Sequence, residues 1–198
     1  MKKANLAIIG MATALMLIGV WWPSFSWSQQ NDLILKNSSY VVTFDIVNRV
    51  PRDVVWILRP SDFSVNRSRV AKYFKADSRT PKPRVKDSDY RNSGFMRGHM
   101  CPAGDRTATK SMMKETFLMS NVAPMSGRLN CGRWSYLEAT TRRLAAIYDS
   151  VRVRVGTLYL DGDTVLIGGG RIRVPSHFFR EVRTARGDSL LLWEIVSQ

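Results

Sequence analysis

The chain has 198 residues and a formal net charge of +14, because 30 lysines and arginines outnumber 16 aspartates and glutamates. This balance excludes an acidic disordered tail, and a content of 44 % hydrophobic and 10 % aromatic residues indicates one compact globular domain. The isoelectric point near 10.4 predicts an anionic partner, for which nucleic acid, acidic polysaccharide and an anionic membrane face are the candidates.

The N-terminus has the pattern of a targeting segment. Two lysines precede the uncharged apolar run Leu6–Val20, and small residues follow it. We expect residues 1–28 to be a signal peptide cleaved after Ser28, which leaves 29–198 as the functional domain in the periplasm or outside the cell. The alternative is a retained membrane anchor formed by residues 6–22, which is at the short limit for a span. Both lysines and no acid lie in the first 28 residues, so the basic character belongs to the domain.

Cys101 and Cys131 are the two cysteines of the chain. An exported protein can keep a disulfide, and a bridge closing about 30 residues would stabilise the fold by roughly 3–4 kcal/mol. Two free buried cysteines are the alternative, and the residues do not decide between them.

The pattern of apolar and polar residues predicts strands at both ends of the domain and helices in its middle. Tyr40–Val47 and Asp53–Leu58 have the composition of a β-hairpin, and residues 59–90 that of a long charged loop. A short helix is expected at Ser111–Ser120, and spacings of three and four predict an amphipathic helix over Cys131–Tyr148. Further strands are expected at Val151–Leu160, Thr164–Ile167, Arg171–Val174, Phe178–Thr184 and Leu190–Val196.

Polar residues that can do chemistry concentrate between residues 89 and 143. Arg97 and His99 stand in an Arg-Gly-His tripeptide. On the long helix Glu138 and Arg142 are four residues apart and therefore neighbours, and helical geometry turns Asn130 toward the same side. Simpler interpretations exist for these residues. His99 could stand in an ordinary turn, Glu138 and Arg142 could form a solvated ion pair, and Asn130 could be a helix N-cap.

The order and spacing of many residues in this region resemble one known family. The residues that carry the resemblance are Asp89-Tyr90, Ser93-Gly94-Phe95, Arg97-Gly98-His99, Pro102-Ala103, Asp105, Glu115-Thr116-Phe117, Ser120-Asn121, Pro124, Leu129-Asn130, Gly132, Trp134, Leu137-Glu138 and Arg142. They resemble the DNA/RNA non-specific endonucleases of the ββα-metal superfamily. The resemblance implies an α+β fold, with a central antiparallel sheet, packed helices and a ββα-metal finger.

The resemblance also implies catalytic roles. His99 would be the general base that takes a proton from water. Asn130 would be the one direct protein ligand of Mg²⁺, with Mn²⁺ as a possible substitute, and the ion would keep most of its waters. Glu138 would orient a water of that hydration shell.

Binding of the substrate is assigned by the same resemblance. Arg97 and Arg142 would contact the scissile phosphate, and Asn121 is placed with the substrate-binding residues, bracing the site by side-chain hydrogen bonds. Contacts to phosphate carry no base information, so the expected partners are DNA and RNA of any sequence. No other cofactor is expected, and a protein inhibitor and the oligomeric state are left open.

One residue departs from the family pattern. Met96 stands where the family has an aspartate before Arg-Gly-His, and a thioether is a far weaker hydrogen-bond acceptor than a carboxylate. The leading hypothesis is therefore an exported, Mg²⁺-dependent, sequence-non-specific endonuclease. The alternatives are a catalytically weak or inactive nucleic-acid-binding module of the same fold and a membrane-anchored protein whose basic surface binds lipid headgroups.

Overall fold

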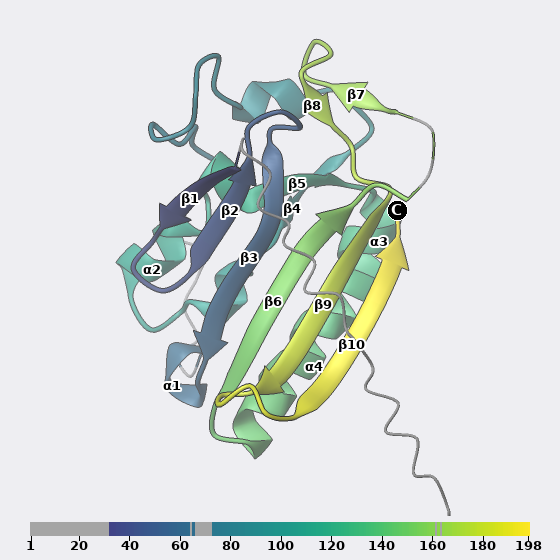
Figure 1. The fold of residues 1–198 in the computed structure, drawn as a ribbon. Helices are drawn as coiled ribbons and strands as arrows, with labels where there is room; N and C mark the ends of the chain where they lie inside the picture. Colours follow the sequence, from purple (N-terminus) through teal and green to yellow (C-terminus); the bar gives the residue numbers. More distant parts are fainter. Residues whose placement is uncertain (1–31, 64, 66–72, 161, 163) are drawn as a thin grey trace, which may run out of the picture.

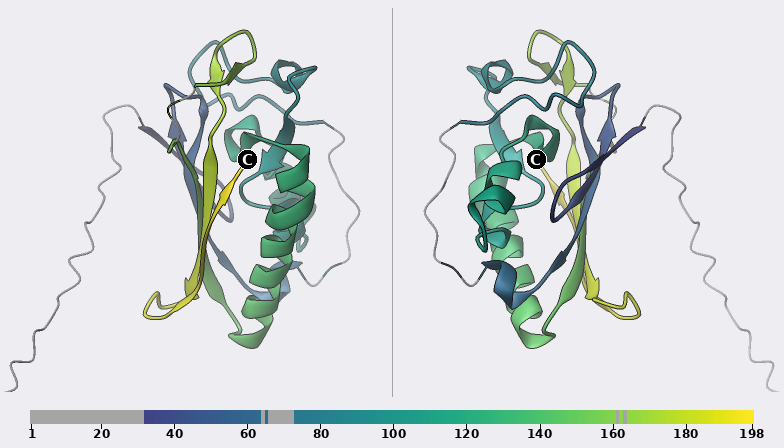
Figure 2. Two further views of the ribbon diagram at one scale, coloured as in Figure 1. Left: turned by 90° about the vertical axis from the view of Figure 1, so that its right-hand side faces the viewer. Right: turned by 90° about the vertical axis from the view of Figure 1, so that its left-hand side faces the viewer.

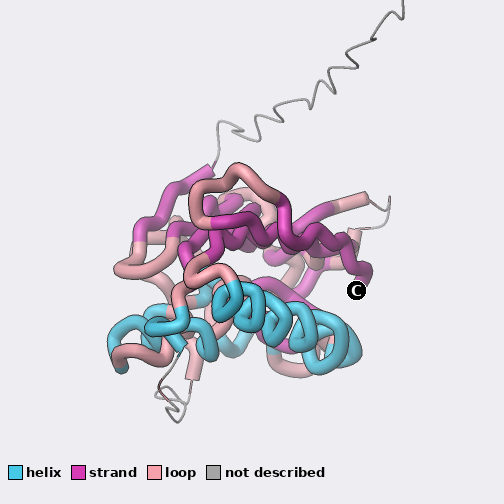
Figure 3. The backbone as a smooth tube through the Cα atoms, turned by 90° about the horizontal axis from the view of Figure 1, so that it is seen from below, coloured by secondary structure: helices cyan, strands magenta, loops and turns pink. Residues whose placement is uncertain are grey.

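A computed structural model describes residues 32–63, 65, 73–160, 162 and 164–198. Within these residues the molecule has two layers, a six-stranded sheet and a set of helices that covers one of its faces (Figures 1 and 2). Seen along the strands, all the helices lie on the same side of the sheet (Figure 3). The expected signal peptide, 1–28, and the alternative anchor, 6–22, lie outside the described residues. No helix of the described residues is long and apolar enough to cross a membrane.

The six-stranded sheet is antiparallel throughout, as expected from the sequence. The predicted hairpin is the pair β2–β3, and the strands predicted after residue 150 include three long members of the sheet. The first strand, β1, precedes the predicted hairpin and was not anticipated. In spatial order the strands are β1 (Asp32–Lys36), β2 (Val41–Asp45), β3 (Val50–Leu58), β6 (Val151–Leu158), β9 (His177–Thr184) and β10 (Leu190–Ser197).

Alternation along the strands explains which face of the sheet is covered. On β6, Val151, Val153 and Val155 are fully buried under the helices, whereas Arg152 and Arg154 point to the other face. The same alternation on β9 buries Phe178, Arg180 and Val182. An arginine therefore occupies an inward position between two apolar core residues.

The longest helix, α4 (Ser135–Ile147), lies across the sheet and buries Leu137, Thr141 and Ala145. It corresponds to the predicted amphipathic helix, but the first four residues of that region belong to a π-helical turn, Asn130–Trp134. The shorter helices are α1 (Pro60–Phe63), α2 (Lys110–Glu115) and α3 (Gly127–Leu129), and 3₁₀ turns occupy Asp87–Tyr90, Ala103–Asp105 and Met119–Asn121.

A small two-stranded unit lies beside α4. Strand β4 (Met96–His99) pairs antiparallel with β5 (Val122–Met125), and β5 leads directly into α3 and the π-helical turn. Gly98 allows the two strands to pack, because a Cβ at this position would lie 2.7 Å from the Cβ of Met125. The order strand, strand, helix is that of the expected ββα finger. A second hairpin, β7 (Leu166–Ile167) with β8 (Ile172–Arg173), projects at one end of the molecule (Figure 1).

Candidate active site in the ββα unit

Hydrogen bonds from the helical part of the ββα unit fix the end of β4. The indole Nε1 of Trp134 donates to the carbonyl oxygen of His99 at 3.1 Å. The next residue, Met100, donates its backbone N–H to the carbonyl of Asn121 at 3.0 Å. His99 is therefore held at the junction of β4 with the helical segment that begins at Asn130.

Two aromatic rings pack against the imidazole of His99. The ring centroid of Phe74 lies 4.9 Å from it, and Phe117 meets it edge-on at 5.0 Å. The histidine is half-buried between them. Contacts on two sides restrict the orientation of the ring, as a general base requires.

Asn121 braces the site by side-chain hydrogen bonds, as expected, but it is too deeply buried to contact a substrate, so its place among the substrate-binding residues was wrong. Its side chain is completely buried, and its Oδ1 accepts the backbone N–H of Cys101 at 2.9 Å. Its Nδ2 donates to the carbonyls of Cys101 at 2.9 Å and Thr116 at 3.0 Å. All this hydrogen bonding serves the backbone that follows His99, so Asn121 braces the site from within the core.

Asn130 is not a helix N-cap, because Ser126 caps α3 and accepts the N–H of Leu129 at 3.2 Å. The Asn130 side chain is thus available for another role. Its Nδ2 lies 3.7 Å from the sulfur of Met96, and among the described residues no hydrogen bond reaches its Oδ1. An uncharged oxygen ligand left open in this way suits a hard cation that keeps several waters.

The surroundings of Asn130 contain two sulfur atoms. The sulfur of Met96 lies 3.9 Å from that of Cys131, and both side chains are exposed. Cys131 is a free thiol, and so is Cys101, which is buried. The structure therefore has no Cys101–Cys131 disulfide. Burial raises the pKa of Cys101 to about 12, so this thiol stays protonated and unreactive.

The described residues contain no group of three or more His, Cys, Asp or Glu side chains that could hold a metal ion. A protein-rich metal cage of the zinc or calcium type is thus absent from the described part of the chain. The Asn130 amide is the open oxygen donor of the ββα unit, with a carboxylate eight residues further along the same helical segment, and one such neutral ligand fits a hydrated Mg²⁺.

That carboxylate belongs to Glu138, which is half-buried on α4. Burial raises its pKa to about 7, and the charges of Arg180 and Arg142 oppose this rise while Asp105 adds to it. A carboxyl group in this state can gain or lose a proton near neutral pH.

Arg142 does not pair with Glu138, although the two are four residues apart. Its Nη1 instead donates to Oδ1 of Asp105 at 2.9 Å. Asp105 is fully buried, and burial raises its pKa while Arg142 opposes the rise. The simple interpretation of a solvated Glu138–Arg142 pair is wrong, since a buried acid from another segment fixes the arginine.

Arg97 is likewise held by an acid. Its Nε lies 2.6 Å from the carboxylate of Asp87, and its Nη2 donates to the carbonyl of the same residue at 2.6 Å. The guanidinium also lies over the ring of Tyr90, 5.5 Å from its centroid. The side chain keeps a quarter of its surface exposed.

Sequence analysis did not assign three of these residues to the site. They are Asp87, which pairs with Arg97, Asp105, which pairs with Arg142, and the buried Arg180. Strand alternation was a usable signal for Arg180, because it stands two residues from Phe178 and from Val182 on a predicted strand. The two ion pairs join residues 10 and 37 positions apart. No local pattern predicts such pairings.

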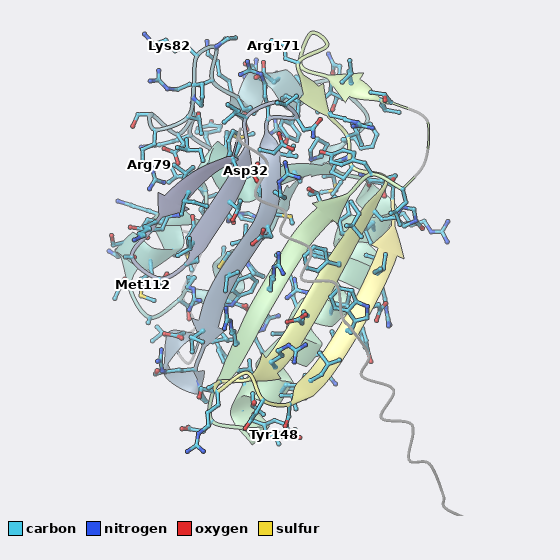
Figure 4. All side chains as sticks on the ribbon, viewed as in Figure 1. Asp32, Arg79, Lys82, Met112, Tyr148 and Arg171 are labelled. Atoms are coloured by element: carbon cyan, nitrogen blue, oxygen red, sulfur yellow. The ribbon has the colours of Figure 1, made fainter. Side chains whose placement is uncertain are left out.

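Basic side chains gather at the end of the molecule that carries the β7–β8 hairpin. Lys82 and Arg171 lie at this end and Tyr148 at the opposite one (Figure 4). Arg171 is paired with Asp89 at 2.8 Å and Arg79 with Asp77 at 2.6 Å. Both of these arginines are therefore neutralised within the fold.

Comparison with known proteins identifies the family of the chain. The model of the DNA/RNA non-specific endonuclease family matches residues 23–195, so the chain belongs to that family. Mitochondrial endonuclease G of Bos taurus is 35 % identical over 153 residues, which cover 72 % of this chain and 51 % of that protein. Nuclease C1 of Cunninghamella echinulata is 35 % identical over 173 residues, 78 % of this chain and 66 % of that protein. The chain thus spans about half to two thirds of these curated relatives.

A solved structure shows the same fold. It is the crystal structure of the EndoG/EndoGI complex, which describes the mechanism of EndoG inhibition. A chain of that complex superposes on this chain with a TM-score of 0.73 and 33 % sequence identity. The match covers 83 % of this chain and 73 % of that chain. The ββα-metal fold expected from the sequence is confirmed.

The comparisons contradict the expected location. Endonuclease G and the yeast mitochondrial nuclease, which is 34 % identical over 150 residues, are named as mitochondrial proteins, and none of these relatives supports export. The prediction of a periplasmic or extracellular protein was wrong. It rested on the pattern of residues 1–28 alone.

Proposed function

We propose that this chain hydrolyses phosphodiester bonds of DNA and RNA, with little sequence preference, in a Mg²⁺-dependent reaction. The observation that carries the proposal is the ββα unit itself, which presents His99 at the end of β4 and Asn130 at the start of the helical segment. The Trp134–His99 hydrogen bond joins the two parts. The family and its nuclease relatives support the same activity.

His99 accepts the proton of the attacking water, the role for which an imidazole is the most common side chain. A cation bound at this site would neutralise charge at the phosphate and at the leaving oxygen. Asn130 Oδ1 would hold that cation, and the Glu138 carboxylate would accept a hydrogen bond from its hydration shell. Glu138 is effective in this role when ionised, so activity falls as the pH drops below its pKa of about 7.

Arg97 and Arg142 bind the phosphate oxygens. Each is oriented in advance by a carboxylate, Asp87 or Asp105, so little side-chain entropy is lost when the substrate binds. Neither contact reads a base, so cleavage should be indifferent to sequence and weaken steeply with salt.

The test uses the full chain with supercoiled plasmid and a structured RNA as substrates. We expect cleavage of both with Mg²⁺, none with EDTA, and a loss of at least about 100-fold in His99→Ala, as is typical for a general base. His177→Ala is the matched control, because this second histidine of the chain contacts Ser176 at 3.0 Å on β9 rather than the ββα unit. Equal activity of His99→Ala and the unmodified chain would refute the assignment.

A weak or inactive nucleic-acid-binding module is the second candidate, and Met96 is the observation in its favour. Its sulfur, rather than a carboxylate, lies next to the Asn130 amide. On this alternative the chain binds nucleic acid without cutting it, and Met96→Asp raises turnover strongly by supplying an acceptor for the hydration shell. An unchanged or lower rate in Met96→Asp argues that the native thioether does not limit catalysis.

A further inference from the structure

Arg180 is a fully buried arginine beneath the proposed site. Its side chain enters the core from β9, and its guanidinium carbon lies 4.5 Å from the ring centroid of Trp134 and 6.0 Å from that of Trp56. Cation–π contacts of this kind orient a guanidinium and offset part of its lost hydration. The two tryptophan rings therefore favour an arginine at this position.

The hydrogen bonds of Arg180 do not explain its burial. Its Nη1 donates to the hydroxyl of Thr141 at 3.3 Å, whereas Nε and Nη2 have no hydrogen-bond partner among the described residues. Moving a cation into the core costs several kcal/mol unless opposite charge compensates for it. Opposite charge close to the guanidinium is therefore required.

The Arg180 guanidinium meets α4 at Thr141, which stands three residues, about one helical turn, after Glu138. This contact places the guanidinium beside the acids of the site, which supply the compensating charge. Burial lowers the pKa of Arg180, and Glu138 is the largest influence against that fall, followed by Asp105. Conversely, Arg180 is the largest influence against the rise in the pKa of Glu138. With Arg142 on Asp105, two acids and two arginines form a group without net charge.

We propose that Arg180 is a positioning residue of the active site, whose buried charge holds the Glu138 carboxylate and, through Asp105, the Arg142 guanidinium in working position. The inference rests on the proposed nuclease function and deepens it. Arg180 touches neither substrate nor cation in this arrangement. Its effect passes through residues on α4 and on the 3₁₀ turn Ala103–Asp105.

Without Arg180, the remaining group would carry one uncompensated negative charge in a poorly hydrated region. Glu138 is then the group that takes up a proton, because it is more exposed than Asp105 and its pKa is already about 7. The charged groups that act on it are Arg180 from β9, Asp105 from the 3₁₀ turn and Arg142 from α4 itself. A protonated Glu138 binds the hydration shell of the cation less well, so kcat falls and the acid limb of the pH profile moves to higher pH.

The first experiment measures steady-state cleavage of a DNA duplex by the full chain from pH 5.5 to 9. We expect Arg180→Met to lower kcat about 10- to 100-fold with KM little changed, as for other partners that orient a metal site from behind. Its acid limb should move to higher pH, and Arg180→Lys should recover part of both effects.

The matched control is Arg106→Met. Arg106 is equally buried but is paired with Asp62 at 3.2 Å and bonded to the carbonyl of Ile57 at 3.0 Å. It is not among the charges that act on Glu138. This variant should lose stability yet keep the pH profile, and the same shift in both variants would overturn the proposal.

The second experiment needs no activity. A double-mutant cycle of Arg180→Met and Glu138→Gln is measured by urea unfolding in EDTA. At pH 8, we expect Arg180→Met to shift the urea midpoint by different amounts when residue 138 is glutamate and when it is glutamine. At pH 5, where Glu138 is protonated, the two shifts should become similar. Additive shifts at both pH values would overturn the proposal.

Should Arg180→Met fail to fold, Thr141→Val replaces it in the cycle. This nearly isosteric change removes the one hydroxyl that the guanidinium contacts in the described core, and a smaller dependence with the same pH trend is expected. A chain that binds but does not cut nucleic acid would refute the proposed function alone, because the unfolding cycle still reports whether Arg180 and Glu138 are coupled.

Discussion

Glu138→Gln offers a quantitative test of the site, because it removes an acid that the fold holds at an energetic cost. The pKa of Glu138 is about 7 in the folded chain, against 4.5 for the unperturbed group. The folded state therefore binds this proton more tightly than the unfolded state does. The free energy of unfolding of the unmodified chain should fall as the pH rises through the range from about 4.5 to 7, and the loss is complete above it.

The magnitude follows from the same two values. A difference of one pKa unit corresponds to about 1.4 kcal/mol, so full ionisation costs the folded state at most about 3.5 kcal/mol, and partial exposure reduces this cost to on the order of 1–3 kcal/mol. Glutamine has nearly the same shape and no charge. The stability difference is the free energy of unfolding of Glu138→Gln minus that of the unmodified chain. This difference should increase by the same amount between pH 5 and pH 8. Nuclease activity should be lost in the variant.

The assay is urea unfolding of both proteins in EDTA at pH 5, 6, 7 and 8, followed by tryptophan fluorescence. Repeating the series with saturating Mg²⁺ is an internal control, since a nearby cation favours the ionised carboxylate and should flatten the trend. A difference that stays constant from pH 5 to pH 8 in EDTA would refute our account of Glu138.

Other predictions address the scaffold of the site. Asn121→Ala removes three buried hydrogen bonds and should lower the free energy of unfolding by about 3 kcal/mol or more, measured by urea unfolding; a loss under about 1 kcal/mol would argue against the bracing role. Gly98→Ala places a Cβ 2.7 Å from that of Met125 and should cost about 1–3 kcal/mol, whereas Gly127→Ala, with 3.6 Å to its nearest neighbour, should cost much less. Thiol titration of the native chain should modify one cysteine rapidly, Cys131, and a second, Cys101, only after unfolding; two fast thiols would contradict the burial of Cys101.

The sequence predicted those parts of the fold that depend on residues close together in the chain, and it missed parts that depend on distant residues. Alternation and helical spacing depend on neighbouring residues, and they located the β2–β3 hairpin, α4 and the long C-terminal strands. Strand β4 escaped because Met-Arg-Gly-His has no β-branched residue, and its pairing with β5 is set by the tight packing of Gly98 on Met125.

The candidate site followed the same division. Similarity to the family selected His99, Asn130 and Glu138, but it could not say what each side chain contacts. Asn121 illustrates the limit: the resemblance placed it with the substrate-binding residues as a brace, and only the fold shows that its amide bonds to the backbone of Cys101 and Thr116. Partners far apart in sequence decide such roles.

The arginines of the site lead to a conclusion about how such a basic chain controls its charge. Arg97, Arg142 and Arg180 are each matched with an acid, so the net charge of +14 is not concentrated where the chemistry is proposed to occur. A phosphate that binds there contacts guanidinium groups that are already oriented, so its binding does not have to order a flexible side chain. Long-range attraction of nucleic acid then depends on exposed lysines and arginines elsewhere. Salt should therefore weaken binding far more than it slows the bound reaction, and KM should rise steeply with ionic strength while kcat changes little.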